Sequence, residues 1–260
     1  MRPSRVLSSV QVLIYRKMMW LLFVNLIVIC SSSTTIPKIT IVNATKAPTA
    51  SLFFFHGSGS SGNDVKHWID ILNGGELKFP HIKINYPSAP AQPYTPNNGM
   101  LSNVWFNRKS ININVPEEME SINPMCQNVL QLIDTEVSNG IPYNRIVVGG
   151  FSMGGALSFH LANRFQLPLA GCFAMSSFLN RHSSVYEALK VNSGTKPPLL
   201  QFHGTADKLV PLNWGEETYS NLKEHGIDGQ FIPLNNVVHE LTGPEVESFK
   251  RWVLEILPET

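Results

Sequence analysis

The 260-residue chain has little cysteine and almost no net charge, and both shortages exclude classes of protein. Its three cysteines, Cys30, Cys126 and Cys172, have neither CxxC spacing nor the even count of a disulfide framework, so we expect free thiols. The formal net charge is +1 and no block of basic residues is present. The charge pattern of a nucleic-acid-binding protein is therefore missing.

The chain also lacks the short motifs that mark metal and nucleotide sites. It has no H-E-x-x-H segment and no G-x-x-x-x-G-K-[S/T] loop, and the strand-to-helix turn around Ser152 has no G-x-G-x-x-G spacing. We therefore expect no metal ion and no cofactor. No Pro-, Gly- or Ser-rich linker divides the interior of the chain, which predicts one domain over residues 36–260.

Residues 1–35 form a separate N-terminal extension. Four basic residues precede the apolar run 18–30, and three serines follow it. This order is typical of a signal peptide or an uncleaved anchor, while a non-structural leader is the alternative. Asn43 begins an N-x-T sequon, which would matter only in a secreted protein. Localisation is left open between the cytoplasm and the secretory pathway or a membrane anchor.

Apolar runs that fit buried strands alternate with helix-like segments along residues 36–260. The expected strands lie at 38–42, 50–55, 82–85, 145–148, 169–174, 199–202 and 230–234. The expected helices lie near 68–72, 116–138, 156–165, 185–189, 213–224 and 245–257. This alternation predicts an α/β fold with a mostly parallel sheet covered by helices on both faces. In such sheets, binding sites form beyond the carboxyl ends of the strands.

The segment Gly150-Phe151-Ser152-Met153-Gly154 has the G-x-S-x-G form of a nucleophile elbow. It stands between an expected strand and an expected helix, where the two glycines would avoid collisions in a sharp turn. The serine hydroxyl would be exposed above the sheet, and the backbone N–H of Met153 could stabilise an oxyanion. A glycine-rich turn in which the serine only caps the helix is the alternative.

A serine nucleophile needs a base and an acid, and in this fold class they follow it in the order Asp, His. Asp207 lies in a loop after the strand near 199–202, and His239 lies between the last strand and the last helix. Alternatively, Asp207 caps a turn and His239 is a surface residue. We expect His160 and His225 to have packing or surface roles.

Six segments together resemble the acyl-protein thioesterase and lysophospholipase-like carboxylesterase family, and its lysophospholipase-like branch in particular. They are FHGSG at 55–59, YPSAP at 86–90, SNVWF at 102–106, GGFSMGG at 149–155, HGTAD at 203–207 and NVVHE at 236–240. The resemblance implies a compact α/β-hydrolase fold with little or no lid. It also implies activity on thioesters or esters of acyl chains, including acyl groups on proteins.

Carried to this sequence, the resemblance makes Ser152 the nucleophile, Asp207 the acid and His239 the base. It assigns the oxyanion hole to the backbone N–H groups of Ser58 and Met153. We expect three further residues to line the substrate site: Trp105, Phe178 and Leu179. Ser60 and Asn107 stand where the family usually has aspartate, so the family's loop bracing and substrate preference do not carry over directly to this sequence.

The expected partner is an acylated protein or a small acyl ester or thioester. No nucleic acid and no stable protein partner is implied, and membrane contact is expected only through the extension or acylated substrates. Two alternatives stay open: a lysophospholipase-type lipid esterase, and a catalytically silent α/β-hydrolase that acts as a binding module. The presence of all three candidate triad residues argues against the silent module.

Overall fold

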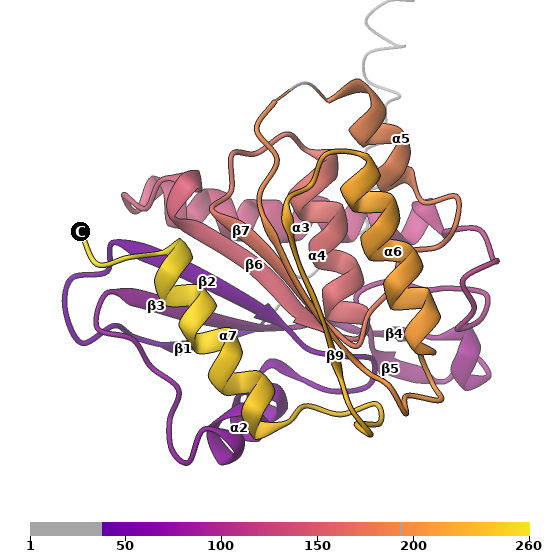
Figure 1. Cartoon of the computed structure of the whole chain (residues 1–260), viewed down its shortest axis with the longest axis horizontal. Helices are drawn as coiled ribbons and strands as arrows, with labels where there is room; N and C mark the ends of the chain where they lie inside the picture. Colours follow the sequence, from indigo (N-terminus) through magenta and orange to yellow (C-terminus); the bar gives the residue numbers. More distant parts are fainter. Residues whose placement is uncertain (1–37, 193) are drawn as a thin grey trace, which may run out of the picture. The chain divides into compact units, whose positions relative to one another are not determined.

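The computed structural model describes residues 38–192 and 194–260, which belong to one compact unit, Thr35–Thr260 (Figure 1). The proposed extension 1–35 lies outside the described residues, as does Cys30. Within the two described ranges, no helix combines the length and apolar character needed to cross a membrane.

The described residues contain one seven-stranded sheet with the order β1-β3-β2-β6-β7-β8-β9 (Figure 1). The strands are β1 (Lys38–Val42), β2 (Ala50–Phe55), β3 (Ile82–Ser88), β6 (Ile146–Phe151), β7 (Gly171–Met175), β8 (Leu199–Gly204) and β9 (Gly229–Leu234). β1 pairs antiparallel with β3, and all the other neighbours pair in parallel. The mostly parallel sheet predicted from the sequence is confirmed.

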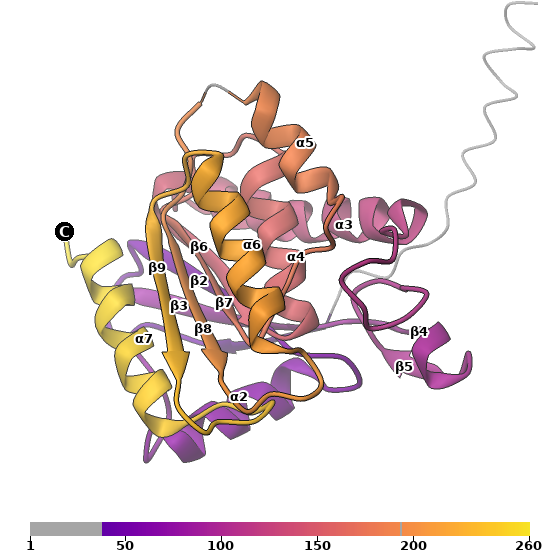
Figure 2. The ribbon, with the colours of Figure 1, turned by 45° about the vertical axis from the view of Figure 1, so that its right-hand side comes forward.

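Helices cover both faces of this sheet (Figure 2). The first face packs against α2 (Gly62–Leu72) and α7 (Gly243–Ile256), and the second against α3 (Met119–Ser138), α4 (Met153–Arg164), α5 (Ser184–Val191) and α6 (Leu212–Glu224). Alternate residues of β2 enter the two cores: Phe53 and Phe55 face α4, whereas Phe54 faces α7. Because both faces are covered, every residue of β2 is buried.

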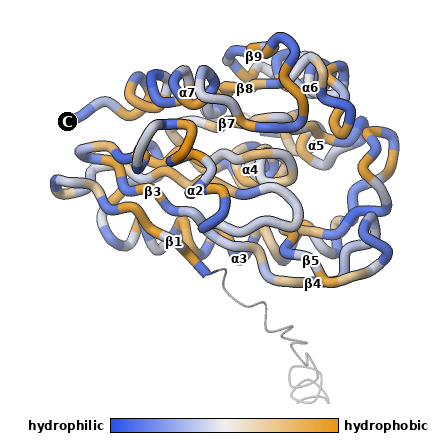
Figure 3. The backbone as a smooth tube through the Cα atoms, turned by 90° about the horizontal axis from the view of Figure 1, so that it is seen from below, coloured by the Kyte–Doolittle hydropathy of each residue, from blue (hydrophilic) through white to orange (hydrophobic). Residues whose placement is uncertain are grey.

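The helix α7 illustrates why these segments form helices. Its buried residues Val246, Phe249 and Val253 recur every three or four positions, while Glu247 and Arg251 are exposed. This spacing places one apolar stripe on the core. The alternation is visible as orange and blue turns along α7 in Figure 3.

The long segment between β3 and α3 is more regular than the sequence suggested. It contains an antiparallel pair of short strands, β4 (Ala91–Pro93) and β5 (Leu101–Asn103), and between them a 3-10 turn at Thr95–Asn97. Asn98, in the left-handed region at φ 54°, reverses the chain. Strands of three residues with proline have too little alternation to be recognised in a sequence.

Candidate active site

Ser152 occupies the sharp turn between β6 and α4. Its backbone has φ 54° and ψ −118°, a left-handed conformation that is uncommon for a residue with a side chain. Its N–H donates to the carbonyl oxygen of Met175 at the end of β7, at 2.8 Å. This bond fixes the strained turn to the neighbouring strand.

The glycines around Ser152 are needed for close packing. An added Cβ would lie 2.2 Å from the Phe55 carbonyl oxygen at Gly150 and 2.1 Å from the same oxygen at Gly154. Any side chain at either position would therefore push β2 away from the elbow. This geometry is that of a nucleophile elbow and not of an ordinary serine cap, since the Ser152 side chain caps no helical N–H.

Ser152, His239 and Asp207 form one hydrogen-bonded chain. Ser152 Oγ lies 3.0 Å from His239 Nε2, and His239 Nδ1 lies 2.7 Å from Asp207 Oδ2. A carboxylate can only accept, so Nδ1 carries the proton and Nε2 is free to accept from the serine hydroxyl. The three residues follow β6, β9 and β8, respectively, so the structure brings them together at the carboxyl edge of the sheet.

The surroundings of Asp207 keep it ionised. Burial alone would raise the pKa of this carboxyl, but the hydrogen bond from His239 and those from the backbone N–H groups of Val210 and Leu209 lower it below its usual value. Both backbone bonds reach Oδ1 at 2.9 Å, which leaves Oδ2 for His239. The ionised carboxylate therefore holds the imidazole in the orientation that presents Nε2 to Ser152.

A second histidine braces the loop that carries Asp207. His203 is fully buried, its Nε2 lies 2.8 Å from the Val210 carbonyl oxygen, and burial lowers its pKa. A Cβ on Gly215 of α6 would lie 2.3 Å from His203 Nδ1, so the glycine leaves room for the ring. Sequence reasoning missed this role, although the histidine directly precedes the Asp207 loop.

Ser58 and Met153, the candidate oxyanion-hole residues, lie side by side. The Ser58 hydroxyl donates to Met153 Sδ at 3.6 Å, and both residues line the cavity that contains Ser152. Met153 is the first residue of α4, where backbone N–H groups have no acceptor within the helix. The Met153 N–H is therefore available to an oxygen atom next to Ser152, and the part of the Ser58 N–H remains a prediction.

The loop after β2 also has G-x-G-x-x-G spacing at Gly57, Gly59 and Gly62, which sequence analysis overlooked. A dinucleotide site of that kind needs an acidic residue about 20 positions further along. The following strand, Ile82–Ser88, has no acidic residue. A Cβ at Gly62 would lie 2.0 Å from the Tyr86 carbonyl oxygen, so this glycine serves helix packing.

The cavity above Ser152 has a volume of about 320 Å³, within the range of small-molecule sites. Phe178 and His239 are among its lining residues, whereas Trp105 and Leu179 are not. Trp105 is fully buried, and its indole N–H donates to the His56 carbonyl oxygen at 2.8 Å. Leu179 is 2% exposed and packs in the core of the second face. The sequence expectation for these two residues therefore does not match their positions.

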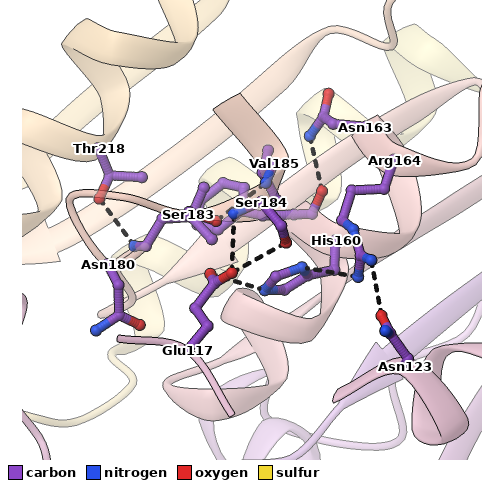
Figure 4. A network of polar contacts seen from close by, with 12 residues as sticks. Glu117, Asn123, His160, Asn163, Arg164, Asn180, Ser183, Ser184, Val185 and Thr218 are labelled. Atoms are coloured by element: carbon purple, nitrogen blue, oxygen red, sulfur yellow. Dashed lines mark hydrogen bonds and ion pairs between the residues drawn. The ribbon is translucent and has the colours of Figure 1, made fainter. Parts of the chain in front are cut away.

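A buried contact between His160 and Glu117 ties the segment before α3 to the elbow helix (Figure 4). His160 Nε2 on α4 lies 3.3 Å from Glu117 Oε1, while Glu117 Oε2 accepts from the N–H and the hydroxyl of Ser184 at 2.9 and 3.0 Å. Burial would raise the pKa of Glu117, but hydrogen bonds from His160, Ser183 and Ser184 lower it to about 2. Because Glu117 is used in this way, α3 begins at Met119 and not at the predicted residue 116.

Neither cysteine in the described part of the chain is placed to hold a metal. Cys126 and Cys172 are buried free thiols, and burial raises the pKa of both. Within residues 38–192 and 194–260, no three His, Cys, Asp or Glu side chains cluster as metal ligands would.

The fold, the strained serine and its hydrogen-bonded partners define an α/β-hydrolase. Comparison with known families places the chain more narrowly: it belongs to the phospholipase/carboxylesterase family, whose model matches residues 37–256. The family resemblance noted in the sequence is thereby confirmed.

Individual relatives agree with this assignment. Mouse lysophospholipase-like protein 1 is 48% identical over 227 residues, which are 87% of this chain and 95% of the mouse protein. Acyl-protein thioesterase 1 homolog 1 of Dictyostelium discoideum is 31% identical over 81% of this chain and 92% of its own length. The solved structure of Arabidopsis thaliana SOBER1 has a TM-score of 0.71 at 25% identity, and covers 80% of this chain and 99% of SOBER1.

Proposed function

We propose that this protein is a serine hydrolase that cleaves acyl thioesters and oxyesters through an acyl-enzyme. The observation that carries the proposal is the hydrogen-bonded chain from Ser152 through His239 to Asp207 on a nucleophile elbow. Such an arrangement activates a hydroxyl that is otherwise a weak nucleophile at neutral pH.

The reaction has two halves. Ser152 Oγ attacks the carbonyl carbon as its proton passes to His239 Nε2, and the backbone N–H groups of Ser58 and Met153 bind the oxyanion. When the tetrahedral intermediate collapses, the thiol or alcohol leaves with the proton from His239. A water molecule then attacks the acyl-serine by the same route, which releases the carboxylic acid and restores Ser152. Asp207 remains ionised throughout and stabilises the positive charge on His239.

The substrate class follows the relatives. One is named an acyl-protein thioesterase and another a lysophospholipase-like protein. We propose an acylated protein as the principal substrate, with small acyl esters also accepted. A lysolipid is the second candidate, favoured by the name of the mouse relative.

Replacement of Ser152 by alanine tests the proposal. Because the triad acts as a unit, we expect hydrolysis of an aryl acyl ester and of an acyl-thioester peptide to fall by at least about a thousandfold. Labelling by a fluorophosphonate probe should disappear as well. Ser138→Ala, which removes an exposed serine of α3, should label and turn over like wild type.

Near wild-type hydrolysis by the Ser152→Ala protein would contradict the assignment of the nucleophile. Failure of the wild-type protein to react with the probe would instead identify a silent binding module. Turnover of lysophosphatidylcholine and of a thioester peptide with the same acyl group distinguishes the two substrate candidates. We expect the larger kcat/KM for the thioester peptide, with no jump in rate at the critical micelle concentration, because little or no lid covers the site.

A further inference from the structure

The His239 ring has a third contact besides its two hydrogen bonds. Its centroid lies 4.8 Å from that of the Phe151 ring, and the two ring planes meet at 45°. The centroid of the Phe151 ring also lies 5.3 Å from that of Trp68 on α2, with the planes at 76°. Trp68, Phe151 and His239 all line the cavity that contains Ser152. The proposed base is therefore the last of three aromatic rings in contact.

The direction of the Phe151 side chain is fixed by its strand. Phe151 is the last residue of β6, the central strand of the sheet, and it pairs with Met175 of β7. Successive side chains of a strand point to opposite faces, and Phe151 lies with Val147 in the core beneath α2 and α7. Gly57 packs beside it, since an added Cβ there would lie 3.1 Å from Phe151 Cδ1. The ring is 7% exposed, so its neighbours hold it in place.

His239, in contrast, belongs to an exposed loop. It follows β9, the edge strand of the sheet, and its neighbours Val238 and Glu240 are exposed. Exposed loops of this kind have lower local stability than central strands. The backbone of this loop is tied to the loop after β8 where the Ala206 N–H donates to the Val237 carbonyl oxygen at 2.9 Å. The orientation of the imidazole therefore depends on the contacts of the side chain itself.

The two hydrogen bonds of the imidazole do not fix the ring completely. Nδ1 contacts Asp207 and Nε2 contacts Ser152, so the bonds hold two points of the ring. The ring can still tilt about the line through its nitrogens, because hydrogen bonds tolerate a broad range of angles. A close neighbour on the ring excludes part of this tilt. Phe151, which its strand holds in place, is such a neighbour.

We propose that Phe151 is a positioning residue that holds the His239 imidazole in the orientation for proton transfer. This inference rests on the proposed function, in which Nε2 takes the proton of Ser152 and returns it to the leaving group. Both transfers need Nε2 within hydrogen-bond distance of the reacting oxygen or sulfur atom. Phe151 exchanges no proton and acts through His239. Trp68 supports the Phe151 ring from the side of α2.

Substitution of Phe151 tests this role. Phe151→Leu keeps an apolar side chain but removes the ring, so kcat/KM for an aryl acyl ester should fall by about five- to tenfold, as expected for loss of an aromatic pair. Phe151→Tyr retains a ring and should keep most of the wild-type rate. Equal losses in these two variants would contradict the role of the ring. Phe231→Leu is the matched control and should keep the wild-type rate, since Phe231 pairs with Tyr219 and is not among the residues that line the cavity.

A double substitution shows whether the loss of activity passes through His239. In the His239→Ala protein the imidazole is missing, so the further change Phe151→Leu should alter the remaining rate by less than about twofold. A full loss in this background would mean that Phe151 acts on the substrate or the elbow, and would overturn the positioning role. If Phe151→Leu does not fold, as thermal unfolding would show, Phe151→Met takes its place. Wild-type turnover by His239→Ala itself would instead overturn the proposed hydrolase mechanism.

Nuclear magnetic resonance gives a readout that needs no turnover. In protein with 13C-labelled histidine, the ring signal of His239 is the one that disappears in His239→Ala. Phe151→Leu should shift and broaden this signal, because an aromatic ring shifts nearby protons and a freer imidazole samples more orientations. An unchanged signal would overturn the positioning role and leave the hydrolase proposal standing. A shifted and broadened signal, in a protein whose wild-type form hydrolyses no ester, would support the ring contact while overturning the proposed hydrolase.

Discussion

Among individual residues, His56 organises the loop that carries Ser58. It is completely buried, and burial lowers its pKa to about 4, so the ring is neutral at pH 7. Nε2 accepts from the Ala89 N–H at 2.9 Å, which leaves the proton on Nδ1 to donate to the Gly57 carbonyl oxygen. Together with the Trp105 indole, this ring fixes the backbone on both sides of Gly57.

The role of Ser58 predicts a difference between two substitutions. Ser58→Pro removes the backbone N–H and should reduce kcat by about a hundred- to a thousandfold, or about 3 to 4 kcal/mol in the barrier. Ser58→Ala keeps the N–H and loses only the hydroxyl contact with Met153, so its loss should be far smaller. Steady-state kinetics on an aryl ester measures both. Equal losses would show that the hydroxyl, and not the backbone, is the important group.

At the scale of secondary structure, the start of α7 contains an unusual carboxyl group. Glu245 forms a capping box with Thr242 but is 1% exposed, and its Oε1 has no partner among the described residues. Burial raises its pKa to about 8, against the weaker effect of the hydrogen bond from the Thr242 N–H. The carboxyl group is therefore mostly protonated at pH 7 in the folded protein.

This shift makes stability depend on pH in a defined direction. Because the pKa of Glu245 is higher in the folded than in the unfolded protein, its protonated carboxyl contributes stability that is fully present below the unfolded-state pKa of 4.5. This contribution is lost as the pH rises through about 8. Glu245→Gln lacks this titration. Relative to wild type, its free energy of unfolding should therefore rise by about 3 kcal/mol between pH 4.5 and 7.

Urea denaturation across this pH range measures the difference. Glu247→Gln is the matched control, since Glu247 is exposed on the same helix and pairs only with Lys250. The plot of its free energy of unfolding against pH should run parallel to that of wild type. If the plot for Glu245→Gln were also parallel to that of wild type, the Glu245 carboxyl would be ionised in the folded protein, and the prediction would be wrong.

The sequence predicted the elements with strong patterns. The buried strands of the parallel sheet are continuous apolar runs, and the bounds of β1 and β2 match the expectation. The pairing of β1 with β3 was not predictable, because neighbouring strands in sequence need not pair. The predicted start of α3 was wrong: proline and acidic residues suit a first turn, but here Glu117 contacts His160 of α4 instead.

At the scale of the whole molecule, the candidate site combines parts that the sequence signals to different degrees. Ser152, Asp207 and His239 could be predicted from their chain order and their places after strands; the structure brings them into contact, and their roles remain a prediction. Other residues that line the cavity, such as Arg108 and Ser177, could not be predicted. Arg108 lies in an irregular segment and Ser177 follows another strand, so only tertiary packing places both in one cavity.

The domain boundary leads to a prediction about the whole chain. A protein that begins at Ile36 should fold and hydrolyse acyl esters with the kcat/KM of the full-length chain. The family match at 37–256 and the compact unit Thr35–Thr260 support this expectation. Thermal unfolding and steady-state kinetics of the two proteins test it. Aggregation or loss of activity of the shorter protein would show that residues 1–35 contribute to the folded structure.

The packing of Gly150 and Gly154 on one carbonyl group has a consequence for how inhibitors would bind. That carbonyl belongs to Phe55, three residues before Ser58, so the elbow packs directly against the start of the loop that carries Ser58. We therefore expect the spacing between the proposed N–H donors, Ser58 and Met153, to be set before a ligand binds. A boronic acid that mimics the tetrahedral intermediate would meet a rigid template, and its residence time would depend on its fit to the acyl cavity rather than on a slow rearrangement of the protein.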